Sequence, residues 1–176
     1  MRSHLLLPPV LLLVLGACAV SMGPPRTKVE DLRVALFDAE GTSVGSVSLT
    51  ADSTGVALTF DVHDLPPGAH AVHLHRSGKC ERPDFLSAGP HLEEADHRHG
   101  LDNPAGPHLG DLEDLVVGPD GRAHAVLRLV PRHGRFATKY ILDGDGSAVI
   151  IHAGPDDRHT DPSGQSGPRI ACGIVA

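Results

Sequence analysis

The sequence predicts an all-β fold, an eight-stranded Greek-key β-barrel or sandwich with two long functional loops. Three observations favour it: short runs in which apolar and polar residues alternate, turn residues between these runs, and a composition of 20 Gly and 15 Pro without Trp. Such frequent breakers favour short strands over a helical bundle, and no segment carries a convincing helical pattern. The length of 176 residues fits one domain with its own core.

The first predicted strands form a meander. Alternating runs at 32–38, 44–50 and 55–62 are separated by the turns AEGTS and ADSTG. In the third run, four apolar side chains share one face: Val56, Leu58, Phe60 and Val62. A further strand follows DLPPGAH and carries His73 and His75, whose side chains share a face because a strand has a period of two.

Strand-like runs return in the second half of the chain. They cover 115–118 and 123–130, joined by the turn PDGR, then 147–153 and the final RIACGIVA. Two long segments rich in Gly, Pro and His or Asp, 77–112 and 154–168, interrupt them. A loop as long as the first is uncommon in a compact domain unless a functional centre organises it.

The N-terminus predicts export. Residues 1–17 begin with a basic Arg2 and contain an apolar run too short to span a bilayer, which is typical of a signal peptide. The following LGAC resembles a bacterial lipobox and favours lipidation of Cys18, with ordinary signal cleavage as the alternative. Residues 18–28 would then tether a domain at 29–176 to a membrane, facing the periplasm or the outside.

Three cysteines in an exported protein leave one without a disulfide partner. If Cys18 carries lipid, Cys80 and Cys172 remain to pair in an oxidising compartment, and the alternative is two buried free thiols. Removal of 1–17 leaves 14 basic and 22 acidic residues, a formal charge of −8 with neutral histidine. Without a basic run or an aromatic platform, this charge argues against nucleic acid as a partner.

The long loop carries a set of residues suited to tetrahedral zinc: His91, His99, His108 and Asp111. Metal binding would order a loop that has little apolar surface to bury, and the alternative is a solvated His-rich loop. His73, His75 and His152 lie on predicted strands. Several imidazoles without a carboxylate or thiolate favour copper or zinc.

Five segments resemble the copper–zinc superoxide dismutase family, in its bacterial exported branch: HLH…C, AGPHLEEADHRHG, NPAGPHLGDL, IIHAGPDD and GPRIACG. They stand in the family's order and spacing, and the resemblance runs from about residue 32 to 176. It implies an eight-stranded Greek-key barrel and an enzyme that converts superoxide into O₂ and H₂O₂ as an antioxidant defence.

The resemblance also implies residue roles, with one copper and one zinc per subunit. The copper ligands would be His73, His75, His91 and His152. The zinc ligands would be His91, His99, His108 and Asp111. As the shared ligand, His91 would bridge both ions as an imidazolate, stabilised by a cation on each side. Asp156 would link His73 to His99, a disulfide would join Cys80 and Cys172, and Arg169 would guide the anion.

In the implied mechanism copper alternates between Cu(II) and Cu(I), His91 delivers a proton, and zinc holds His91 in place. Among the features that depart from the family, Glu93 and Glu94 stand where Asn-Pro is common, and the second loop has no lysine to steer the anion. Neither removes a ligand. Two other classes remain to be weighed, a non-catalytic metal-binding protein on the same barrel and a structural lipoprotein, and the sequence leaves both a monomer and a homodimer open.

Overall fold

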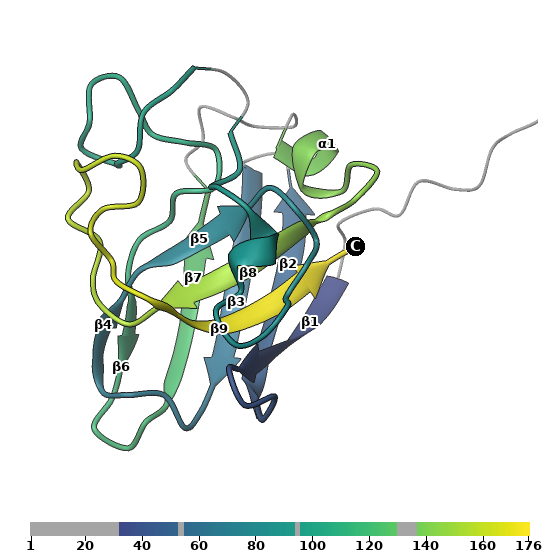
Figure 1. Cartoon of the computed structure of the whole chain (residues 1–176), viewed down its shortest axis with the longest axis vertical. Helices are drawn as coiled ribbons and strands as arrows, with labels where there is room; N and C mark the ends of the chain where they lie inside the picture. Colours follow the sequence, from purple (N-terminus) through teal and green to yellow (C-terminus); the bar gives the residue numbers. More distant parts are fainter. Residues whose placement is uncertain (1–31, 53–54, 94–95, 130–136) are drawn as a thin grey trace, which may run out of the picture.

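The computed structural model describes residues 32–52, 55–93, 96–129 and 137–176 (Figure 1). The predicted signal peptide, Cys18 and the tether lie outside these residues. Within the described ranges, no helix has the length and apolar character needed to cross a membrane.

The described residues form nine strands, a short α-helix and a 3-10 turn. The strands are β1 Leu32–Asp38, β2 Ser43–Asp52, β3 Gly55–Val62, β4 Gly68–His70, β5 Val72–His75, β6 Leu115–Val117, β7 Ala123–Arg128, β8 Ser147–His152 and β9 Arg169–Val175. The helix α1 covers Ala137–Ile141 and the 3-10 turn covers Leu86–Ala88. Neither helical element carries a periodic pattern long enough for the sequence to predict it.

Seven strands form one antiparallel sheet in the order β5-β8-β9-β1-β2-β3-β7, and β4 pairs with β6. The sheet is curled, and β1 and β9, the first and last strands along the chain, lie side by side (Figure 1). This non-sequential order confirms the predicted all-β fold class. The structure adds a short strand that the sequence did not predict: β4 lies within the segment DLPPGAH, where His70 pairs with β6, while Val72 in the predicted strand pairs with β8.

The inner face of the sheet carries the main hydrophobic core. In β3 the predicted alternation holds at one face, where Phe60 and Leu58 are fully buried, while Asp61 is exposed. β5 and β8 differ, because every residue of both strands is buried. The second face of β8 is covered by a smaller cluster, in which Phe85 and Ala88 pack with Ala148 and Ile150 of the strand. These two doubly covered strands carry three of the predicted metal ligands.

The predicted disulfide between Cys80 and Cys172 is confirmed. Cys172 lies in β9 and is fully buried, and Cys80 packs against the smaller cluster. The bond therefore fixes the segment 80–89 to the outer face of β8 and β9. This segment leads directly to His91.

Candidate metal centre

Four histidines from three parts of the chain meet at the edge of the sheet: His73, His75, His91 and His152. The first two lie on β5, which pairs with the β8 strand that ends at His152, and a bridge between the backbones of His75 and His91 adds the fourth. One nitrogen of each ring lies within 4.8 Å of the others, and all four residues are buried. We call this set the four-histidine group.

Each ring of the four-histidine group has one buried nitrogen without a hydrogen-bond partner among the described residues. These atoms are Nδ1 of His73 and Nε2 of His75, His91 and His152. Burying a polar atom without a hydrogen-bond partner costs free energy, so four such atoms facing one another indicate a site for a ligand. Four convergent lone pairs fit a metal ion that prefers imidazole, as copper and zinc do.

A carboxylate organises the second cluster. Oδ1 of Asp111 lies 3.0 Å from Nδ1 of His91, 3.1 Å from Nδ1 of His99 and 3.5 Å from Nδ1 of His108. Its Oδ2 accepts the backbone N–H groups of Gly100 and His108 at 2.9 and 3.0 Å. One fully buried side chain thus holds three imidazoles and the loop that carries them.

The tightest four-residue set around Asp111 differs in one member from the predicted zinc ligands. The ligand atoms that lie within 4.8 Å of one another belong to His73, His91, His99 and Asp111. His108 stands just outside this set, although its Nδ1 faces Asp111 at an ion-pair distance. His73 enters it because its ring centroid lies 4.0 Å from that of His91.

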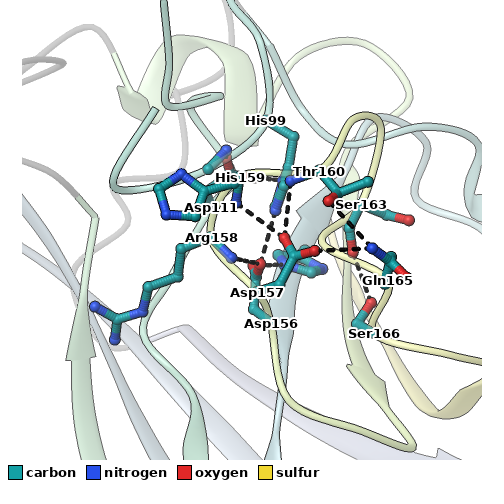
Figure 2. Close-up of polar contacts among 12 residues, drawn as sticks. His99, Asp111, Asp156, Asp157, Arg158, His159, Thr160, Ser163, Gln165 and Ser166 are labelled. Atoms are coloured by element: carbon teal, nitrogen blue, oxygen red, sulfur yellow. Dashed lines mark hydrogen bonds and ion pairs between the residues drawn. The ribbon is translucent and has the colours of Figure 1, made fainter. Parts of the chain in front are cut away.

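Asp156 joins the two clusters, and Figure 2 shows its carboxylate beside His99 of the second one. Its Oδ2 lies 2.8 Å from Nε2 of His73 and its Oδ1 lies 2.9 Å from Nε2 of His99. Both rings are fully buried. Each has its Nε2 on the Asp156 carboxylate, which leaves its Nδ1 on the side of the candidate metal centre. Such a contact sets the tautomer and the orientation of a ligating imidazole.

Burial keeps the four-histidine group neutral. It lowers the pKa of His75 to about 2, of His91 to about 3 and of His152 to about 4, and it lowers the pKa of His73 as well. An imidazole ligates a metal through a neutral nitrogen. At pH 7 these rings are already in the ligating form.

In the second cluster, around Asp111, His99 and Asp111 both favour their charged forms. Burial alone would lower the pKa of His99, but hydrogen bonds with Asp111 and Asp156 outweigh it and raise the pKa to about 9. Burial would raise the pKa of Asp111, yet the surrounding imidazoles, His108 first, hold it well below its usual range. The cluster therefore favours positive charge at its centre, which a divalent cation supplies.

Arg169 approaches the four-histidine group from β9. Its guanidinium donates to the carbonyl oxygens of Phe85 at 2.6 Å and Gly89 at 2.8 Å. The same Gly89 oxygen lies 2.8 Å from Nδ1 of His75. The segment fixed by the disulfide therefore positions both the arginine and one ring of the group.

The second long loop contains organising residues that the sequence did not reveal. The Asp161 carboxylate accepts the backbone N–H of His99 at 2.6 Å and contacts Arg98 at 3.1 Å. The Asp157 carboxylate accepts N–H groups of His159 and Thr160 (Figure 2). The signal for Asp157 was present in its spacing to Thr160, which is that of a turn.

Gly164 packs directly on the link between the clusters. Its φ is +64°, and a Cβ atom there would overlap Oδ1 of Asp156 and lie 2.8 Å from Nε2 of His99. We expect Gly164→Ala to weaken zinc binding by about 10- to 100-fold, because the carboxylate can no longer hold the ring. Chelator competition measures this loss.

Gly144→Ala provides the matched control, since nothing lies within 4 Å of its added Cβ and its φ is not in the left-handed region. Parental zinc affinity in the Gly164 variant would show that Asp156 is not needed to hold His99.

The sequence is similar to a family model and to several known proteins. The family model for copper/zinc superoxide dismutase (SODC) matches residues 43–175. A superoxide dismutase [Cu-Zn] of Caulobacter vibrioides is 41% identical over 77% of this chain and 80% of the relative. The superoxide dismutase-like protein YojM of Bacillus subtilis is also 41% identical, over 81% of this chain and 74% of the relative.

Solved structures of SOD-like and Cu/Zn superoxide dismutase proteins share this fold. The crystal structure of a SOD-like protein from Bacillus subtilis matches with a TM-score of 0.75 and 38% identity, covering 82% of this chain and 97% of that one. The Cu/Zn superoxide dismutase from Brucella abortus matches with a TM-score of 0.70 and 25% identity, covering 84% of this chain and all of that one.

Proposed function

Because the chain belongs to the copper/zinc superoxide dismutase family, we propose that it converts two superoxide anions into O₂ and H₂O₂ in the cell envelope. The observation that carries the proposal is the four-histidine group, with its four buried nitrogens that lack partners among the described residues. Copper bound there supplies the one-electron oxidation and reduction that the reaction requires.

We assign copper to the four-histidine group: His73, His75, His91 and His152. Nε2 of His73 already contacts Asp156, so its Nδ1 is the one nitrogen left to bind an ion. We therefore give His73 to copper alone and assign zinc to the remaining groups around Asp111: His91, His99, His108 and Asp111. The Nδ1 atoms of all three imidazoles lie within 3.5 Å of the same Asp111 oxygen, which supports this set.

His91 belongs to both sets and has a nitrogen for each. Its Nδ1 is on the Asp111 side, and its buried Nε2 has no partner among the described residues. We propose that Nε2 takes up a proton during the cycle and delivers it to the reduced substrate, while the Asp111 side keeps the ring in place. H₂O₂ formation consumes two protons, so a proton donor near the substrate is required.

Arg169 would bind and orient the anion. The domain after removal of 1–17 has a formal charge of −8, so superoxide needs a local positive region to override the overall repulsion. The guanidinium is half-buried and fixed at two carbonyl oxygens, which leaves its remaining N–H groups to receive an anion.

Arg169→Ala is expected to slow superoxide removal by about tenfold at low ionic strength, and to flatten its salt dependence. Screening over a Debye length of about 8 Å at physiological salt reduces the difference between variant and parent. Pulse radiolysis at several salt concentrations measures both effects. Arg122→Ala removes an exposed arginine from the turn before β7 and serves as the charge-matched control. Equal rates for the Arg169 variant and the parent would exclude the steering role.

A non-catalytic metal-binding protein is the second candidate, since one relative is named only as superoxide dismutase-like. The same assay separates the two functions. Protein loaded with both metals should remove superoxide, and protein loaded with zinc alone should not. Binding of copper at the four-histidine group without any removal of superoxide would favour the second candidate.

We also propose the organisation of the exported protein: a signal peptide at 1–17, a lipidated Cys18 with a tether to residue 28, and the enzyme domain at 29–176. The confirmed disulfide supports an oxidising compartment, because such bonds persist outside the cytosol. The intact mass of the native protein tests the proposal, since a lipid on Cys18 adds a defined mass that ordinary signal cleavage does not.

A further inference from the structure

His108 differs from the other two imidazoles around Asp111 in what faces its outer nitrogen. Nε2 of His99 lies on Asp156, and Nε2 of His91 belongs to the four-histidine group. Nε2 of His108 instead lies 3.7 Å from Oε2 of Glu93, an ion-pair distance. Glu93 stands where Asn-Pro is common in relatives, so the family pattern assigns it no role.

The position of Glu93 is fixed by its neighbours. The preceding Leu92 is buried, and its N–H donates to the carbonyl oxygen of Leu74 on β5 at 2.8 Å. Its own carbonyl oxygen accepts the N–H of Gly110 at 2.8 Å. Leu92 therefore ties Glu93 both to the strand that carries His73 and His75 and to the loop that carries His108.

The other carboxylate oxygen of Glu93 is held from β5. Oε1 lies 3.2 Å from Nη2 of Arg76, directly after the strand. About one third of the Glu93 side chain is exposed, so this pair is partly screened, whereas His108 is largely buried. The arginine thus leaves Oε2 directed at the imidazole.

We propose that Glu93 is a positioning residue for zinc through His108. Its carboxylate attracts the Nε2–H of the ring and so fixes the tautomer whose Nδ1 lone pair faces Asp111. Glu93 faces His108 at 3.7 Å, a longer contact than the 2.9 Å hydrogen bond between Asp156 and His99, so each of the two zinc-only imidazoles has an acidic partner at its Nε2. The inference rests on the proposed function, because it concerns the zinc side of the same site.

The experiment compares four variants of the full protein: Glu93→Leu, Glu93→Gln, Arg76→Met and Glu40→Gln. Zinc affinity is measured by chelator competition, and the ligand geometry by the visible absorption of Co²⁺ placed in the zinc site. Glu93→Leu should weaken zinc binding by about 10- to 100-fold and shift the cobalt bands. Glu93→Gln keeps a hydrogen-bond acceptor without its charge, so it should lose less zinc affinity than Glu93→Leu.

Two controls separate positioning from other effects. Arg76→Met breaks the exposed ion pair but leaves the carboxylate on His108, so its zinc affinity should change by less than about fivefold. Glu40→Gln removes one negative charge from an exposed turn between β1 and β2 and should change nothing. Melting of metal-free protein should be the same in the parent and in both Glu93 variants.

Three results would overturn the inference alone. The first is parental zinc affinity in Glu93→Leu, and the second is a loss of zinc affinity in Arg76→Met as large as that in Glu93→Leu. The third is a melting temperature of Glu93→Leu that falls as much in the metal-free protein as in the zinc-loaded protein. In each case a parent that binds zinc and removes superoxide leaves the proposed function intact. A parent that binds no zinc would overturn both the inference and the zinc assignment.

Discussion

Replacing His73 with alanine is expected to abolish superoxide removal by protein supplied with copper and zinc. The ring is fully buried on β5, and its Nδ1 is one of the four nitrogens proposed to hold copper. The substitution removes this ligand and also takes one partner from Asp156. Pulse radiolysis should give the rate observed without protein, and metal analysis should find copper strongly reduced.

Two further variants make the result specific. His124→Ala removes an exposed histidine from β7 and should keep the parental rate and copper content. His75→Gln removes a second proposed copper ligand with less loss of volume, so it distinguishes a missing ligand from a damaged fold. Parental activity and copper content in either ligand variant would refute the copper assignment.

Conversion of both Cys80 and Cys172 to serine is expected to lower the free energy of unfolding by about 4 to 5 kcal/mol as an upper figure. The bond joins residues 92 positions apart, and release of so long a loop gives the unfolded chain a large gain in entropy. Urea unfolding of metal-free protein measures the change without the contribution of metals, which stabilise only the folded form.

The same variant should also lose activity in protein that is still folded. The segment 80–89 carries the carbonyl oxygens of Phe85 and Gly89 that hold Arg169, and the disulfide fixes this segment. Chemical reduction of the parent provides the matched control, because it breaks the bond without changing the sequence. For the stability prediction, an unfolding free energy of the double-serine variant within about 1 kcal/mol of the parent would contradict the expected loss.

The sequence predicted those parts of the fold that depend on local patterns. Period-two alternation located β3 and its buried face at Phe60, and the Gly- and Pro-rich turns separated the strands. Burial of both faces of β5 and β8 could not be predicted in this way. For β8 it depends on Phe85 and Ala88, which lie in the segment that the Cys80–Cys172 disulfide joins to β9.

The candidate site was predicted through the motifs and not through the loops that shape it. The residues of the four-histidine group could be named because their spacing matches a family. The loop contacts of Asp161 and Gly164 join segments about 60 residues apart or require a left-handed backbone, and neither leaves a periodic trace. His108 lies just outside the tightest set around Asp111, a detail of side-chain placement that spacing alone does not give.

With copper and zinc bound as proposed, the position of Asp156 between His73 and His99 would couple the binding of one ion to the binding of the other. The two loading orders begin and end with the same species, so any factor by which zinc favours copper is also the factor by which copper favours zinc. Where that factor exceeds one, a cell starved of one metal would retain less of the other, and scarcity of the ion that performs no redox chemistry would reduce the proposed oxidant defence.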